Sequence, residues 1–251
     1  MMRLDVYLAA NGFCKSRSKA AEAIAEGRVL VDGVPAQKAS FPVEEGVLIE
    51  VIQPASRYVS RAGYKLEAAL DGFALDVRGK TALDIGASTG GFTDCLLQRG
   101  AAFVYAVDVG TAQLDPALRQ DARVCCREQT NARYLRREQF EKQLDIVTVD
   151  VSFLSQKLLY PAIADVLSVG GILVTLIKPQ FEVGRAHVGK GGIVRDPNGK
   201  LFRALLASLT AEAQAKGLHL QGTLPSPIPG GDGNKEYLAY FLRTGQERNE
   251  G

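Results

Sequence analysis

Histidine, cysteine and tryptophan are scarce in this sequence. Its 251 residues include two histidines, four cysteines and no tryptophan. Two histidines leave little material for a histidine-ligated metal or for histidine-dependent nucleophilic catalysis. Four cysteines are too few for a disulfide scaffold, and adjacent Cys125 and Cys126 have neither zinc-knuckle nor CxxC spacing. We therefore expect reduced thiols, a buried Cys125-Cys126 strand and no bound metal.

Long apolar runs and a strong charge of one sign are also absent. The longest apolar candidate, residues 169–177, contains two glycines and is followed by Lys178, whereas a membrane span needs about 20 apolar residues. Asp5, Asn11 and Lys15 interrupt the first apolar stretches, so no secretory signal is expected. A net charge of +2 provides no general attraction for nucleic acid, so any such contact needs local patches. These absences predict a cytoplasmic protein without membrane contact.

The composition that remains is that of a globular protein with two domains. Hydrophobic residues make up 46% of the chain and charged residues 23%, which is an ordinary balance. A pattern change near residue 53 separates a small unit, residues 1–52, from a larger one, residues 58–246. We expect residues 53–57 to be a linker and residues 247–251 a polar tail.

The small unit combines two predicted helices with short strands. Leu4, Tyr7 and Leu8 recur at helical spacing, a serine at 16 or 18 begins a second helix, and Asp32-Gly33 predicts a hairpin. Positive charges cluster around these elements, a pattern that is usually a solvated helix face and only sometimes an RNA site. The order of residues 3–5, 15–20 and 27–33 resembles the S4-type RNA-binding domain over about fifty residues. That resemblance implies RNA contacts by Arg3, Lys15, Arg17, Lys19 and Arg28.

The larger unit alternates predicted strands and helices, which indicates an α/β fold with a Rossmann-like, mostly parallel sheet. Strands are predicted at residues 82–85, 103–107, 124–126, 145–149 and 172–177, with a late antiparallel pair at 218–220 and 237–242. Helices are predicted near residues 92–99, 114–120, 155–167 and 198–216.

A glycine-rich turn after the 82–85 strand is the first candidate binding motif. It lacks the lysine of a phosphate-binding loop and departs from the GxGxxG spacing of dinucleotide sites. Asp108 ends the next strand, where a carboxylate can accept the ribose hydroxyls of a nucleoside. The combination favours S-adenosylmethionine over a merely tight loop, while Asn131 is either an adenine contact or a loop cap. The predicted cofactor residues are Asp84, Gly86, Ala87, Ser88, Thr89, Gly90, Gly91, Phe92, Asp108, Asn131 and Asp150.

Four polar residues in separate segments form the second candidate motif. Lys65 lies on a predicted helix, Asp150 and Lys178 each follow a strand, and Glu236 precedes the last strand. Because ligands bind at the carboxyl ends of parallel strands, Asp150 and Lys178 should border the same crevice as the glycine turn. On spacing alone, a structural ion-pair network is the favoured interpretation, because such networks are common.

The order of these four residues resembles the Lys-Asp-Lys-Glu set of FtsJ-like RNA 2'-O-methyltransferases. With an S4-type domain in front, the chain is identified as a member of the TlyA family, described both as haemolysins and as ribosomal RNA cytidine 2'-O-methyltransferases. Residues 60–63, 150–153, 178–182 and 191–196 add to the resemblance, which covers nearly the whole chain.

The resemblance implies methyl transfer from S-adenosylmethionine to a ribose 2'-hydroxyl of ribosomal RNA. Lys178 is the candidate base, Asp150 would hold it, and Lys65 and Glu236 would orient the reacting groups. Further RNA contacts are expected from Arg61, Arg185, Lys190 and Arg195.

Three other functions stay open at this point: a non-catalytic ribosome assembly factor, a membrane-lytic haemolysin and a small-molecule methyltransferase. The four-residue set argues against the first, the absence of an apolar span against the second, and the S4-type domain against the third. In the family, longer members with extra terminal helices are expected to modify both subunit RNAs and shorter ones the large-subunit RNA. This chain has a short first unit and a short tail, so large-subunit 23S RNA is favoured over 16S RNA.

Overall fold

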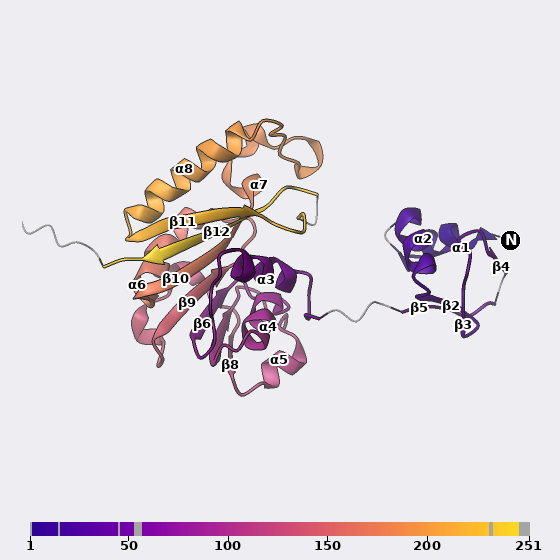
Figure 1. The fold of residues 1–251 in the computed structure, drawn as a ribbon, viewed down its shortest axis with the longest axis horizontal. Coiled ribbons are helices and arrows are strands. Elements are labelled where there is room, and N and C mark those ends of the chain that lie inside the picture. Colours follow the sequence, from indigo (N-terminus) through magenta and orange to yellow (C-terminus); the bar gives the residue numbers. More distant parts are fainter. Residues whose placement is uncertain (1, 15, 45, 53–56, 231–232, 246–251) are drawn as a thin grey trace, which may run out of the picture. The chain divides into compact units, whose positions relative to one another are not determined.

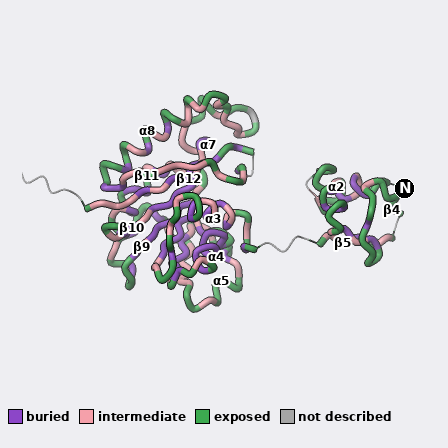
Figure 2. Tube along the Cα trace, viewed as in Figure 1, coloured by how far each residue is buried: buried purple, intermediate pink, exposed green. Residues whose placement is uncertain are grey.

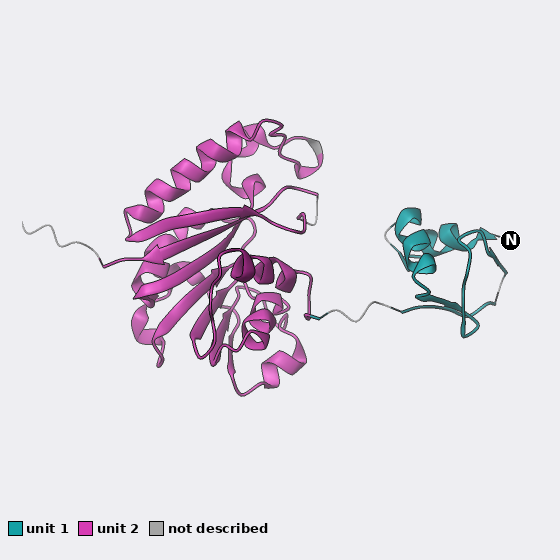
Figure 3. Cartoon of the chain, viewed as in Figure 1, with its two compact units in different colours: residues 1–57 teal, residues 58–251 magenta. Residues whose placement is uncertain are grey.

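The computed structural model describes residues 2–14, 16–44, 46–52, 57–230 and 233–245, with Lys190 described for its backbone only. The chain divides into two compact units, residues 1–57 and 58–251 (Figure 3). This division falls at the predicted seam. Most of the predicted linker, residues 53–56, and the predicted tail, residues 247–251, lie outside the described residues, as does Lys15.

Unit 1 packs two helices against short strands. The helices are α1 (Leu4–Ala10) and α2 (Arg17–Ala25), and Ser16 caps α2 by accepting a hydrogen bond from the Lys19 amide at 3.3 Å. The sheet has the order β3-β2-β5, with β2 (Val29–Val31), β3 (Val34–Pro35) and β5 (Ile49–Val51), and β1 (Met2–Arg3) pairs with β4 (Pro42–Val43). Asp32 and Gly33 both have positive φ, as a tight two-residue hairpin turn requires.

Unit 2 is built on a seven-stranded sheet with the order β11-β12-β10-β9-β6-β7-β8 (Figure 1). Strand β12 runs antiparallel to both of its neighbours, and the other adjacent pairs are parallel. The strands are β6 (Thr81–Ile85), β7 (Phe103–Val107), β8 (Val124–Arg127), β9 (Leu144–Val149), β10 (Leu167–Ile177), β11 (Leu218–Pro225) and β12 (Tyr237–Arg243).

Helices cover both faces of this sheet, and two buried apolar clusters result (Figure 2). One cluster lies under α3 (Ala62–Gly72), α4 (Gly91–Gln98) and α5 (Pro116–Gln120), and the other under α6 (Tyr160–Val166) and α8 (Lys200–Gln214). Alternation along β6 separates them, because Leu83 and Ile85 face the α6 and α8 side while Ala82 faces the other. Shorter elements are α7 (Pro179–Glu182) and the 3-10 turns Ala132–Tyr134, Arg137–Gln139, Gln156–Leu158, Arg185–His187 and Lys190–Gly192.

Three sequence-based predictions about this unit differ from the structure. The helix expected at residues 155–167 is a 3-10 turn followed by α6, and strand β10 begins at Leu167 instead of residue 172. Gly170, with φ of +80°, interrupts the β9–β10 register without ending the strand. Cys125 and Cys126 are half-buried, because β8 is an edge strand and not a central one.

The topology fixes where ligands can enter. From β6 the chain continues outward through β7 and β8, and it then returns to β9 on the other side of β6. The carboxyl ends of β6 and β9 therefore border the switch point of the sheet, where open α/β folds bind their ligands. In the described part of the chain, no helix combines the length and apolarity that crossing a membrane requires.

Candidate active site

The glycine-rich turn after β6 adopts a backbone that few residue types tolerate. Gly86, Ser88 and Gly90 all have positive φ, at +82°, +47° and +96°. A Cβ on Gly86 would lie 2.4 Å from the carbonyl oxygen of Asp150, which explains why glycine occupies this position. The turn thereby lies close against the end of β9 and leads into α4, which begins at Gly91.

Asp84, which the sequence predicts as a cofactor contact, is instead buried beneath the glycine-rich turn. Its side chain is fully buried, and its two carboxylate oxygens accept hydrogen bonds from the Thr93 hydroxyl at 2.7 Å and the Thr148 hydroxyl at 3.0 Å. Burial raises the pKa of Asp84 to about 6, although the two hydroxyls lower it. The carboxylate thus ties β6 to α4 and β9 beneath the glycine turn and does not face the pocket.

Asp108 lies where the sequence predicts a nucleoside contact. One carboxylate oxygen accepts from the Ser88 amide at 2.9 Å, and the other accepts from the Gly110 amide at 2.7 Å. Each oxygen retains a further lone pair, so the fixed carboxylate is able to accept ligand hydroxyls. Asn131 lines the same pocket, and its side-chain oxygen also accepts from the Arg133 amide at 3.1 Å, so it caps the following turn as well.

Two adjoining pockets lie at this edge of the sheet. The larger, about 550 Å³, extends past Asp108 and Asn131. The smaller, about 190 Å³, is bordered by Asp150, Lys178 and Ser60. Gly86, Ser88, Asp150 and Ser152 line both pockets, which makes them one continuous site. Of the predicted cofactor residues, only Asp84 and Gly90 line neither pocket. Those not yet mentioned, Ala87, Thr89, Gly91 and Phe92, line the smaller one.

The four predicted catalytic residues form two ion pairs. Lys178 lies 2.6 Å from an Asp150 oxygen, and its Nζ also donates to the Ser152 hydroxyl at 3.0 Å. Lys65 donates to Glu236 at 2.5 Å, with side chains 11% and 3% exposed. The antiparallel register pairs Ile177 with Tyr237, so Lys178 and Glu236 leave their strands at adjacent positions.

Contacts between the loop after β9 and α7 were not anticipated from the sequence. Glu182 accepts hydrogen bonds from the Ser155 hydroxyl at 2.7 Å and the Gln156 amide at 2.8 Å. Burial raises the pKa of Glu182, against the effect of these donors. In the same loop, Phe153 has a φ of +61°, is 89% exposed and packs against Phe181 with ring centroids 4.7 Å apart. The loops that carry Asp150 and Lys178 are therefore joined at several points.

The four described residues among the predicted RNA contacts of unit 1 each pair with an acidic neighbour. Arg3 and Arg17 both pair at 3.0 Å with Asp5, a buried carboxylate whose pKa these guanidinium groups lower to about 2. Lys19 pairs with Glu22, and Arg28 pairs with a Glu26 oxygen at 2.5 Å. Arg3, Arg17 and Lys19 nevertheless expose more than half of their side chains.

Three of the four predicted RNA contacts of unit 2, Arg61, Arg185 and Arg195, have exposed side chains. Arg61 directly precedes α3, Arg185 begins a 3-10 turn, and Arg195 follows the glycine-rich stretch. That stretch is held by a bridge between Val188 and Val194.

Within the described residues, no group of three or more histidine, cysteine or acidic side chains is arranged to hold a metal ion.

Comparison with known proteins places both units. The FtsJ-like methyltransferase model matches residues 58–243, and the S4 domain model matches residues 2–49. The 16S/23S rRNA (cytidine-2'-O)-methyltransferase TlyA of Mycobacterium tuberculosis is 45% identical over 98% of this chain and 91% of its own length. The 23S rRNA (cytidine-2'-O)-methyltransferase TlyA of Campylobacter jejuni is 34% identical over 97% of this chain and 100% of its own length.

Solved structures give the same result. A protein described as a hemolysin of Streptococcus thermophilus is 43% identical to this chain and superposes with a TM-score of 0.75. The match covers 97% of this chain and 88% of the other. An S-adenosylmethionine-dependent methyltransferase of Listeria monocytogenes shares only the fold, at 16% identity and a TM-score of 0.54 over 74% of this chain and all of its own. The chain therefore belongs to the FtsJ-like methyltransferase family, in the TlyA group that carries an S4 domain.

Proposed function

We propose that the protein transfers a methyl group from S-adenosylmethionine to the ribose 2'-hydroxyl of a cytidine in ribosomal RNA. One observation carries this proposal: the Lys178–Asp150 ion pair borders the small pocket that continues into the pocket of Asp108. A methyl donor held along Asp108 would thus present its reactive end beside a lysine and a carboxylate. Similarity to the two ribosomal RNA methyltransferases above, and the S4 domain, support RNA as the acceptor.

The residues present fit the proposed cofactor. The left-handed turn at residues 86–90 lets the chain pass closely around a ligand, and Asp108 offers fixed acceptors for the two ribose hydroxyls. Asn131, at the Asp108 end of the larger pocket, would contact the adenine. When bound, S-adenosylmethionine supplies a methyl group already activated by its sulfonium charge.

In the proposed reaction, Lys178 first releases one proton to solvent, and its neutral amine then accepts the proton of the ribose hydroxyl as the oxygen attacks. Asp150 and Ser152 contact the lysine Nζ at 2.6 and 3.0 Å, so the side chain of the base is already positioned before the substrate binds. The carboxylate of Asp150 also offsets positive charge at the reactive end of the site. The buried ion pair of Lys65 and Glu236 fixes the start of β12 beside Lys178. This pair would thereby orient the ribose hydroxyl that accepts the methyl group.

Unit 1 would bind the RNA while unit 2 performs the transfer. Arg3, Arg17 and Lys19 present exposed cationic groups for phosphates, and Arg28, whose side chain is 21% exposed, would add a further contact. Arg61, Arg185 and Arg195 would do the same in unit 2. We infer large-subunit RNA as the substrate because both related methyltransferases are described as acting on 23S RNA, and we infer the cytoplasm as the place of action.

A membrane-active role is suggested by the hemolysin descriptions of several relatives, among them the Streptococcus thermophilus protein. An assembly factor that binds the cofactor without catalysis is the other alternative. Such a factor has no need for a lysine held by two partners at the end of the pocket, and this favours catalysis.

Replacement of Lys178 by alanine tests the assignment of the base. The substitution removes the Nζ and leaves the glycine turn and Asp108 in place, so methyl transfer should be lost while calorimetry shows unchanged cofactor affinity. Equal single-turnover rates for the variant and the wild type would show that Lys178 is not the base.

A further inference from the structure

A third pocket lies beside the catalytic residues and shares no lining residue with the two cofactor pockets. It has a volume of about 410 Å³ and is formed by Pro179, residues 193–197, the start of α8, residues 233–235 and Tyr237. Pro179 directly follows Lys178, and Tyr237 directly follows Glu236. We call it the side pocket. A molecule in it would be a close neighbour of the reacting ribose and would not displace the cofactor.

The walls of the side pocket are aromatic and apolar, and its rim is cationic. The rings of Phe202 and Tyr237 stack with centroids 3.5 Å apart and planes 13° apart. Arg195 and Lys235 contribute to the lining and are exposed. Flat apolar walls favour a planar ring, and exposed cations favour the phosphates attached to it. This pairing of features is typical of sites for unstacked RNA bases.

The side pocket is formed by the protein's own contacts and needs no ligand to open it. Asn234 is 2% exposed; its side-chain oxygen accepts from the Val194 amide at 2.9 Å, and its amide group donates to the Gly192 carbonyl at 2.9 Å. Asp196 accepts from the Leu201 and Phe202 amides at 3.2 and 2.8 Å, which fixes the start of α8. These bonds join the segments before and after the cavity, so binding would require little rearrangement.

We propose that the side pocket binds one unpaired base of the substrate RNA within reach of the target nucleotide, with Arg195 and Lys235 on the adjoining phosphates. This inference rests on the proposed function, since it assumes an RNA substrate. It assigns a second role to this edge of the sheet. The cofactor pockets hold the methyl donor, and the side pocket sets the position of the RNA strand relative to Lys178.

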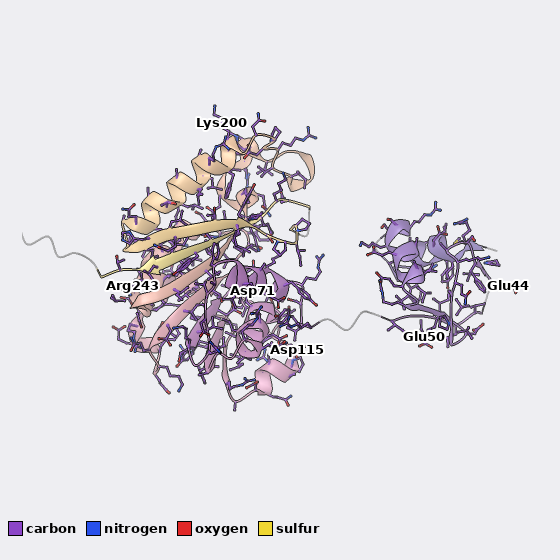
Figure 4. The ribbon with its side chains drawn as sticks, viewed as in Figure 1. Glu44, Glu50, Asp71, Asp115, Lys200 and Arg243 are labelled. Atoms are coloured by element: carbon purple, nitrogen blue, oxygen red, sulfur yellow. The ribbon has the colours of Figure 1, made fainter. Side chains whose placement is uncertain are left out.

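Binding measurements on the full chain test the pocket with two variants and one control. Phe202→Leu removes an aromatic wall but stays apolar, and Arg195→Ala removes a rim charge at an exposed position. The control, Lys216→Ala, removes a charge two residues beyond the C-terminal end of α8, a helix about 22 Å long whose first residue, Lys200, is labelled in Figure 4. Each of the two pocket variants should weaken binding of a target-site RNA hairpin about tenfold, and the control should not. Unchanged affinity for S-adenosylmethionine shows that the variants are folded.

Removal of single bases from the RNA identifies the occupant. Abasic sites are introduced one at a time at the target and at three positions on either side, and each RNA is bound to wild type and to Phe202→Leu. We expect one position at which removal of the base weakens binding to wild type about tenfold. At that position the same removal should not weaken binding to Phe202→Leu any further than the substitution already has, because the two changes remove the same contact. Additive losses at every position would overturn the proposal. Methylation of the intact hairpin by wild type is measured in parallel, so a failed methyltransferase assignment is distinguished from a failed pocket assignment.

Discussion

The buried carboxylate of Asp84 provides a quantitative test of the packing beneath the glycine turn. In the folded protein its pKa is about 6, against 3.8 for an ordinary aspartate, because burial disfavours the ionised form. A difference of about two pKa units corresponds to about 3 kcal/mol. Above pH 6 the folded protein therefore contains a carboxylate that is less stable, by about that amount, than the same group in the unfolded chain.

The sign of the pH dependence follows from which state holds the proton. Between pH 3.8 and about 6, Asp84 is protonated when folded and ionised when unfolded. Its contribution to stability is thus fully present below pH 3.8 and is lost as the pH rises through 6. Asparagine has nearly the same shape, does not ionise and still hydrogen-bonds the hydroxyls of Thr93 and Thr148. The free energy of unfolding of Asp84→Asn minus that of wild type should therefore increase by about 3 kcal/mol from pH 3.8 to pH 7.

Urea denaturation of both proteins across this pH range, followed by circular dichroism, measures that difference. Asp121→Asn is the control, because Arg123 lowers the pKa of Asp121. Its stabilisation is present at neutral pH and is lost on acidification, so the difference for this variant should change in the opposite direction. A difference for Asp84→Asn that stays constant with pH would refute the description of Asp84 as a buried, unfavourably ionised group.

Three further predictions concern the site and unit 1. Gly86→Ala should abolish S-adenosylmethionine binding in calorimetry, since the new Cβ would lie 2.4 Å from the Asp150 carbonyl; retained affinity would contradict this. Glu182→Gln should lower kcat about tenfold with unchanged cofactor affinity, because one of two acceptors that join the catalytic loops becomes a donor. An unchanged kcat would show that this junction does not position the base. Arg17→Ala should weaken RNA binding and reduce the slope of log affinity against log salt by about one, and an unchanged slope would exclude a phosphate contact.

The sequence predicts the crevice well because strand ends are predictable. Apolar runs followed by Gly86, Asp108, Asp150 and Lys178 mark the carboxyl ends of four parallel strands, and such ends meet at one edge of a sheet. No knowledge of side-chain packing is needed for that inference. The position of Glu236 beside Lys178 follows in the same way once the last strand pairs antiparallel with β10.

Contacts between separate segments could not be predicted in this way. The sequence predicts Asp84 as a ligand residue because it precedes a glycine turn. In the structure its side chain points instead toward Thr93 of α4 and Thr148 of β9. The junction between Glu182 and the loop after β9 joins residues 26 and 27 positions apart, with no periodic signal. The length of β10 was also missed, since Gly170 predicts a break and the sheet accommodates it as an irregularity.

Methyl transfer to separate ribosomal subunits is the most direct test of the proposed function. Undermethylated large and small subunits are each incubated with labelled S-adenosylmethionine and either wild type or Lys178→Ala, and the label is mapped to the nucleotide and atom. The proposed function predicts label on a cytidine 2'-oxygen of 23S RNA with wild type and none with the variant. Cofactor binding without label in either subunit, or label on a base instead of a ribose, would contradict it.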